Sequence, residues 1–154
     1  MKLLLIILAI IPLSLSAQID ILSFSEFQEK ISDNDSKLLV INFWATWCKP
    51  CVNELPHFNK THSEYKDKGL EMWLVSLDFE NQMESRVIPF LKENNLNPEV
   101  FILKQEGNSW IDEVSTSWSG AIPATLMINK EGRHFYEQEF TYEQLENTIK
   151  EHLN

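Results

Sequence analysis

The chain contains two cysteines, Cys48 and Cys51, and only two residues separate them. An apolar run at residues 38–44 precedes the pair and a helical pattern follows it, so the pair is predicted to lie where a strand turns into a helix. Two thiols at this spacing can close into a small disulfide ring and reopen by thiolate attack. The spacing therefore indicates redox chemistry with a thiol or disulfide partner.

The first of the two sulfurs is the expected nucleophile. The free N–H groups and the positive dipole end of the following helix favour a thiolate at Cys48, and the neighbouring Lys49 adds a positive charge. Lowering a thiol pKa from about 8.5 to about 7 requires roughly 2 kcal/mol, whereas an exposed helix terminus supplies about 0.3–1 kcal/mol. We therefore also expect hydrogen bonds to this sulfur. Cys51, one turn further along, is expected to be more buried and to act as the resolving thiol.

Two other interpretations of the cysteine pair have less support. A zinc site typically needs four ligands. The chain has no further cysteine, and its histidines form no pair at matching spacing: His57, His62, His134 and His152. A purely structural disulfide rarely spans two residues, because so short a loop removes little chain entropy. Redox chemistry is thus the favoured interpretation.

The N-terminal segment has the features of an export signal. Residues 1–17 combine a positive Lys2, an apolar run at residues 3–13 and small residues at the end. The run is short for a transmembrane span, so we predict a cleaved signal peptide at residues 1–17 and a mature domain at residues 18–154. An uncleaved membrane anchor is the alternative. In both cases the domain is expected outside the cytoplasm, periplasmic or secreted.

Composition and charge limit the classes of partner. The sequence is 44% hydrophobic and has few glycines and prolines, which predicts a globular core. The formal net charge of −10 argues against binding to nucleic acid or to an anionic membrane surface, and its simplest role is solubility. We find no internal repeat, low-complexity tract or linker, so residues 18–154 are predicted to form a single domain.

Hydrophobic periodicity predicts an alternation of helices and strands after the signal segment. A hairpin comes late in the chain, which indicates a mixed sheet covered by helices on both faces. Residues 109–118 fit either a helix or an irregular loop. The other predicted elements are helices at residues 23–31, 51–65, 82–95 and 142–153, strands at residues 38–44, 70–77, 100–103 and 124–128, and a hairpin strand at residues 134–140.

Three segments together resemble the thioredoxin superfamily, and within it the TlpA/ResA-like extracytoplasmic thiol-disulfide oxidoreductases. They are residues 42–51, residues 54–56 and residues 122–132. The resemblance covers essentially the whole mature chain. It implies a thioredoxin-like α/β fold, with a central mixed sheet and helices on both faces. Residues 82–120 leave room for the extra helix and strand that the TlpA/ResA-like group inserts before the proline strand.

The resemblance also assigns roles to individual residues. Cys48 matches the attacking thiol and Cys51 the resolving thiol of a redox-active disulfide. Pro123 matches the cis-proline that faces the dithiol, and its cis bond would let Ile122 offer main-chain hydrogen bonds to an extended substrate strand. Trp47 is expected to shield the sulfurs and to contact substrate.

A proton acceptor for the resolving thiol is a separate question. Asn42 stands where thioredoxin has a buried acid, and an amide cannot accept that proton. Glu54 lies one helical turn after Cys51, and ResA-like proteins carry an acid at this place. Burial near two sulfurs would raise its pKa and make it a workable acid and base. The alternative is an ordinary exposed acid in the first helical turn, which the helix dipole would favour.

The resulting hypothesis is a protein-disulfide reductase. Reduced Cys48 would attack a disulfide in a partner protein and Cys51 would resolve the mixed disulfide, after which a membrane-bound electron donor would reduce the pair again. The resemblance suggests apocytochrome c, copper-site assembly proteins or other secreted thiol proteins as substrates. No cofactor and no resident metal are expected.

The alternative is a non-catalytic copper chaperone on the same fold. In such a protein two thiolates and a distant histidine would hold Cu(I), and His134 is the candidate here. The copper chaperones of this fold generally use a Cys-x-x-x-Cys spacing, from which this chain departs.

Overall fold

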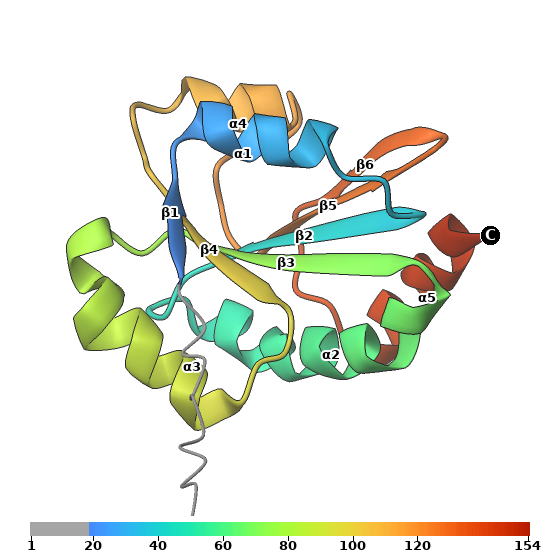
Figure 1. The fold of residues 1–154 in the computed structure, drawn as a ribbon, viewed down its shortest axis with the longest axis horizontal. Coiled ribbons are helices and arrows are strands. Elements are labelled where there is room, and N and C mark those ends of the chain that lie inside the picture. The colour runs from blue at the N-terminus through green and yellow to red at the C-terminus, as the bar shows by residue number, and fades with distance from the viewer. Residues whose placement is uncertain (1–18) are drawn as a thin grey trace, which may run out of the picture.

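The computed structural model describes residues 19–154 (Figure 1). The predicted signal peptide at residues 1–17 lies outside these residues. Within residues 19–154 no helix has the length and apolar character needed to cross a membrane. The elements are β1 (Asp20–Leu22), α1 (Phe24–Ser32), β2 (Leu38–Trp44), α2 (Lys49–Tyr65), β3 (Leu70–Ser76), α3 (Ile88–Asn94), β4 (Glu99–Leu103), α4 (Ser109–Val114), β5 (Ala124–Asn129), β6 (Gly132–Tyr136) and α5 (Tyr142–Leu153).

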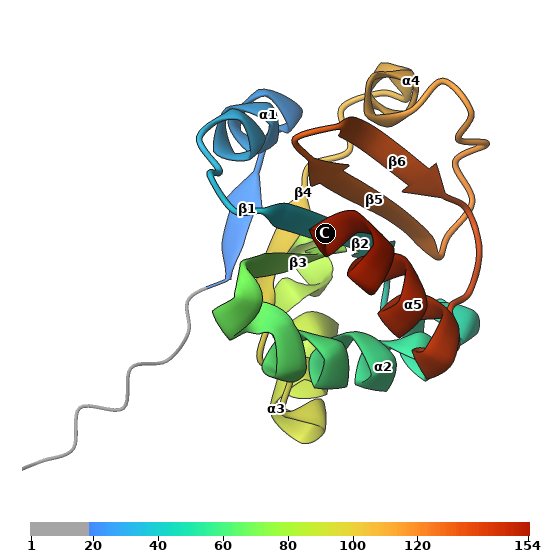
Figure 2. The same ribbon diagram turned by 90° about the vertical axis from the view of Figure 1, so that its right-hand side faces the viewer.

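The strands form one six-stranded mixed sheet in the order β1-β4-β3-β2-β5-β6. The first four strands of that order run parallel, and β5 and β6 run antiparallel to their neighbours. Helices α1 and α4 cover one face of the sheet, whereas α2, α3 and α5 cover the other (Figures 1 and 2). The predicted fold class, a mixed sheet with helices on both faces, is confirmed.

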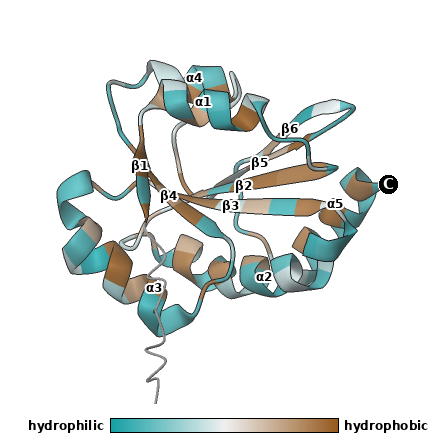
Figure 3. Ribbon diagram, in the orientation of Figure 1, coloured by the Kyte–Doolittle hydropathy of each residue, from teal (hydrophilic) through white to brown (hydrophobic). Residues whose placement is uncertain are grey.

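Strand β2 lies at the centre of the sheet, and all seven of its residues are buried. Its side chains alternate between two hydrophobic clusters because successive residues of a strand point to opposite faces. Leu38, Val40 and Trp44 pack toward α2 and α5. Leu39, Ile41 and Phe43 belong to the cluster under α1 and α4. Figure 3 shows the resulting concentration of hydrophobic colour along β2.

Capping residues set the ends of two helices as the sequence predicts. Ser23 caps α1 and forms a reciprocal capping box with Glu26. Thr141 caps α5 in the same way with Gln144. The predicted helix at residues 142–153 therefore has the observed bounds.

The predicted helix at residues 82–95 is divided. A 3₁₀ turn at Glu80–Gln82 and a π turn at Met83–Val87 precede α3, which begins only at Ile88. Pro89 lies in the first turn of α3, where its missing N–H costs no helical hydrogen bond. The proline thus marks the start of a shorter helix.

The hairpin strand also differs from its prediction. Strand β6 begins at Gly132 and ends at Tyr136, so placing it at residues 134–140 was wrong. After Tyr136 the chain leaves the sheet, and Phe140 enters the core beside Phe58. Strand β1 was not predicted, because its three residues are too few to show a period. It pairs with β4, and β4 lies within residues 82–120, where the extra helix and strand were expected.

Candidate active site

The two cysteines form a disulfide at the start of α2. Cys48 is the N-cap residue of this helix, and the backbone N–H of Cys51 donates to its sulfur at 3.3 Å. Cys48 is 6% exposed and Cys51 is fully buried, which is the order predicted for an attacking and a resolving thiol. The Cys51 N–H is thus a direct hydrogen-bond donor of the kind expected to stabilise a thiolate at Cys48.

A distant loop lies against this disulfide. The Cys48 sulfur is 3.7 Å from the carbonyl oxygen of Ile122, and the Ile122–Pro123 peptide bond is cis. Strand β5 positions this loop because it starts at Ala124, which pairs with Phe43 of β2. Pro123 is buried, and Ile122 is half-buried. The fold therefore brings Ile122 and Pro123 to the dithiol from a separate part of the chain.

A buried polar network lies on the face of β2 that packs against α2. The side-chain amide of Asn42 donates to a Glu54 carboxylate oxygen at 2.8 Å and to the Thr125 hydroxyl at 3.3 Å. The other Glu54 oxygen accepts the backbone N–H of Phe140 at 2.7 Å. Asn42, Glu54 and Thr125 are all fully buried. Glu54 is therefore not the exposed acid of the alternative interpretation.

Burial dominates the acidity of Glu54. Removal from water raises its pKa from 4.5 to about 7, against the hydrogen bonds from Phe140 and Asn42, which stabilise the carboxylate and lower it. The negative charge of Glu139 adds a smaller upward effect. A carboxyl group with this pKa exchanges protons readily near neutral pH.

A second buried acid, Asp78, was not predicted from the sequence. Its carboxylate accepts the backbone N–H of Thr46 at 2.9 Å, the Thr46 hydroxyl at 2.6 Å and the Ser76 hydroxyl at 2.8 Å. Asp78 follows β3, and Thr46 lies in the turn between β2 and Cys48. These bonds fix the turn that carries the cysteines. An aspartate directly after an apolar strand was the available signal.

The tryptophans near the cysteines differ in exposure. Trp44 is fully buried, whereas Trp47 is 58% exposed. Trp47 therefore presents its indole to solvent beside Cys48. Among residues 19–154 one other large hydrophobic side chain is exposed to this extent, Phe79 at 63%.

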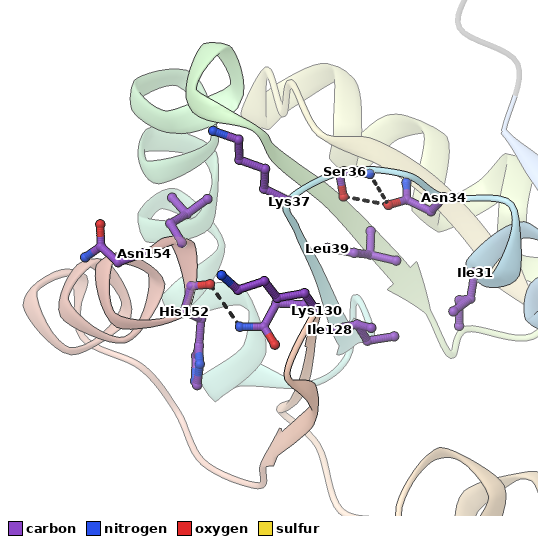
Figure 4. A pocket seen from close by; sticks show the side chains of 11 residues that line it. Ile31, Asn34, Ser36, Lys37, Leu39, Ile128, Lys130, His152 and Asn154 are labelled. Atoms are coloured by element: carbon purple, nitrogen blue, oxygen red, sulfur yellow. Dashed lines mark hydrogen bonds between the residues drawn. The ribbon is translucent and has the colours of Figure 1, made fainter.

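A cavity of about 550 Å³ lies away from the dithiol. Its lining includes Leu39 at the start of β2 and Ile128 near the end of β5, together with Lys37, Lys130 and His152 (Figure 4). The cysteines follow the opposite end of β2. None of the residues predicted for the dithiol site lines this cavity.

His134, the histidine considered as a copper ligand, lies on β6. It pairs with Met127 of β5, which places it roughly 10 Å along the strand from Ala124, where β5 begins after the cis-proline loop. Its ring stacks on that of His152 with centroids 4.1 Å apart. Within residues 19–154 no group of three or more histidine, cysteine, aspartate or glutamate side chains could hold a metal ion.

The sequence matches one protein family and is similar to several individual proteins that share a name. The AhpC/TSA family matches residues 19–133. A protein from Bacillus cereus named thiol-disulfide oxidoreductase ResA is 36% identical over 104 residues, which are 68% of this chain and 56% of that protein. A protein of the same name from Bacillus thuringiensis is 34% identical over 124 residues, which are 79% of this chain and 66% of that protein. The chain thus spans less than two thirds of the length of these relatives.

Comparison of the structure with solved structures gives the same fold. A thiol:disulfide interchange protein of the thioredoxin family from Chlorobium tepidum superposes with a TM-score of 0.65 at 20% identity. The match covers 77% of this chain and 81% of that one. The fold is therefore thioredoxin-like, as the family resemblance implied.

Proposed function

Since the chain belongs to the AhpC/TSA family and has a thioredoxin-like fold, we propose that it is a thiol-disulfide oxidoreductase that reduces disulfides in partner proteins outside the cytoplasm. One observation carries the proposal. The Cys48–Cys51 pair lies at the N-terminus of α2 and faces the cis-Pro123 loop. The names of the ResA relatives support the same reaction class.

In the first step the Cys48 thiolate attacks one sulfur of a substrate disulfide. A mixed disulfide forms, and the other substrate sulfur leaves as a thiolate that takes a proton from solvent. The N–H of Cys51 and the N-terminus of α2 stabilise the negative charge on Cys48 before the attack. The carbonyl oxygen of Ile122 lies 3.7 Å from this sulfur, which supports a role for Ile122 in binding the substrate main chain.

In the second step Cys51 releases the substrate. Its thiol loses a proton and attacks Cys48, so that the Cys48–Cys51 disulfide forms and the second substrate sulfur leaves as a thiolate that is then protonated. Glu54 is one helical turn from Cys51 on α2, and its pKa near 7 suits it to accept the Cys51 proton. Two electrons and two protons have then passed to the substrate.

The wider cycle rests on the TlpA/ResA-like resemblance. A membrane-bound electron donor returns two electrons to the disulfide, and the substrates are secreted thiol proteins of the apocytochrome c or copper-site assembly type. The predicted signal segment at residues 1–17 would direct the domain to the compartment where these partners occur.

Covalent trapping tests the proposal. The Cys51→Ser variant retains the attacking thiol and lacks the resolving one, so it should accumulate mixed disulfides with substrate proteins in the native host. The matched Cys48→Ser variant should trap far less. Non-reducing electrophoresis followed by mass spectrometry measures both. Equal trapping by the two variants would contradict the assigned roles, and no trapping by Cys51→Ser would contradict the reductase function.

A further inference from the structure

Two exposed aromatic residues follow neighbouring strands at the same end of the sheet. Strands β2 and β3 are parallel, and their last residues, Trp44 and Ser76, are paired. Trp47 and Phe79 each come three residues after these partners, and both are mostly exposed. Within residues 19–154 the exposed large hydrophobic side chains therefore come from the loops that follow β2 and β3, at the end of the sheet where Cys48 lies.

Asp78 holds these two loops together. It accepts both the backbone N–H and the hydroxyl of Thr46, the residue before Trp47. It is also the residue before Phe79. After Phe79, the backbone N–H of Gln82 donates to the carbonyl oxygen of Phe79 at 2.8 Å. The backbone that carries both aromatics is thus fixed before any partner arrives, which lowers the entropic cost of binding.

The local charge indicates what kind of segment fits there. Glu80 directly follows Phe79 and Glu84 comes four residues later, and both are exposed. The exposed positive charges in these segments are Lys49, next to Cys48, and Arg86, so the acids are the charges closest in sequence to Phe79. The whole chain carries a formal net charge of −10. Aromatic residues are enriched at the centre of protein-binding surfaces, and polar or charged residues form their rim. Complementarity favours a partner segment that brings an apolar side chain to the aromatics and a positive charge to the acids.

We propose that Phe79 and Trp47 form a docking surface beside Cys48 for an extended, cysteine-containing segment of the substrate, with a large apolar side chain next to the cysteine and a basic residue flanking it. The proposal rests on the proposed reductase function and names its substrate class. The reaction itself is unchanged. The protein dithiol becomes the Cys48–Cys51 disulfide, and the substrate disulfide becomes two thiols.

Single-turnover kinetics with synthetic peptides tests this docking surface. The full chain is reduced with an external thiol, freed of it, and mixed with peptide disulfides that differ only beside the cysteine. One peptide carries Phe and Lys there, the second Gly and Lys, and the third Phe and Glu. The second-order rate constant of protein oxidation is measured for the wild type, Phe79→Ala and Phe79→Tyr. Lys130→Ala, at the far end of the sheet, is the control variant.

The wild type should prefer the Phe-Lys peptide over the Gly-Lys peptide by about fivefold to tenfold, because part of one aromatic side chain becomes buried. Phe79→Ala should lose most of this ratio, and Phe79→Tyr and Lys130→Ala should keep it. Taking the ratio within each variant cancels any general change in Cys48 reactivity. The Phe-Glu peptide should react more slowly than the Phe-Lys peptide, and added salt should reduce that difference.

Two failures are distinguishable. If the wild type is oxidised by none of the peptides nor by glutathione disulfide, the proposed reductase function is wrong. If it reacts and Phe79→Ala keeps the wild-type preference for the Phe-Lys peptide, the docking surface is wrong while the reductase function stands. An equal rate with the Phe-Lys and Phe-Glu peptides would overturn the basic-residue part of the substrate class.

Discussion

The two faces of strand β2 serve different purposes. The face under α1 and α4 is purely apolar and rich in aromatic rings. The face against α2 carries Asn42, which contacts Glu54 and Thr125 close to the disulfide. Because side chains alternate along a strand, neighbouring residues of one segment supply both environments. Residues that pack the core and residues proposed to take part in redox chemistry therefore lie on one strand, on its two opposite faces.

Aromatic packing dominates the face under α1 and α4. Phe43 and Trp118 have ring centroids 4.8 Å apart, and Trp110 lies 5.3 Å from Trp118. The ring centroid of Phe27, on α1, lies 6.1 Å from that of Phe43 and 6.4 Å from that of Trp73. Such rings bury large areas and add favourable edge-to-face contacts. This face therefore accounts for much of the stability of the domain.

The opposite face contains buried polar groups that lower the stability of the fold. The side-chain oxygen of Asn42 is buried without a hydrogen-bond partner among the described residues. A buried unsatisfied polar atom costs roughly 1–3 kcal/mol. Glu54 is also buried there, at the cost that raises its pKa to about 7. Substitutions on the two faces should therefore have different effects.

Substitution on the apolar face should change stability alone. Phe27→Ala removes a side chain that is 1% exposed, and we expect the free energy of unfolding to fall by about 3–5 kcal/mol. The oxidation rate of the folded fraction by glutathione disulfide should stay at the wild-type value. Urea denaturation and single-turnover kinetics measure the two quantities. Phe27→Leu, which leaves a smaller cavity, is the matched control, and a rate that fell together with stability would contradict the separation of the faces.

Substitution on the polar face should change the kinetics of the reaction. Glu54→Gln retains the size of the side chain and removes its proton acceptor, so we expect Cys51 to resolve the mixed disulfide about 100-fold more slowly at neutral pH. The wild-type rate of this step should rise with pH around 7 as the carboxyl group ionises, and the variant should lack that rise. Stopped-flow kinetics from pH 5 to 9 measures both, and unchanged pH dependence would remove Glu54 from the mechanism.

The same substitution should change how stability depends on pH. The folded-state pKa of Glu54 lies above its ordinary value of 4.5, so the folded protein holds a proton that the unfolded chain has lost. Its contribution to stability is complete below about pH 4.5 and is lost as pH rises through about 7. The difference in unfolding free energy between wild type and Glu54→Gln should therefore change across this window. A constant difference would contradict the raised pKa.

The smallest effect is expected in the turn between β2 and Cys48. Thr46→Val removes one hydrogen bond to the Asp78 carboxylate and leaves the backbone bond intact, so we expect a loss of about 1–2 kcal/mol in unfolding free energy. Thr116→Val, at an exposed position, is the control and should change stability by less than about 0.5 kcal/mol. Equal effects of the two substitutions would mean that the Asp78 contact does not hold the turn.

Much of the fold could be predicted because it depends on local patterns. The apolar run at residues 38–44 became β2 with the same bounds, and Thr141 placed the start of α5. The cysteine spacing predicted the disulfide at a helix start. The resemblance to a known family, rather than composition, supplied the cis bond before Pro123.

The rest depends on partners that are distant in sequence. No periodicity reveals that Asp78 meets Thr46, 32 positions earlier, or that Thr125 meets Asn42. The exposure of Phe79 was equally hidden, since an aromatic residue after a strand is usually expected in the core. The hairpin strand was predicted to begin two residues late and to end four residues late, because the apolar Phe140 fits the pattern of a strand although the chain has left the sheet after Tyr136.

The way the chain leaves strand β6 has a consequence for acidity. Phe140 gives its backbone N–H to Glu54, which lies 86 positions earlier, and this donor holds the pKa of that carboxyl group below what burial alone would set. The length of the connection at residues 137–140 therefore governs proton affinity as well as chain direction. A change in this connection that moved the Phe140 N–H away from Glu54 would let the carboxyl group keep its proton into more alkaline solution.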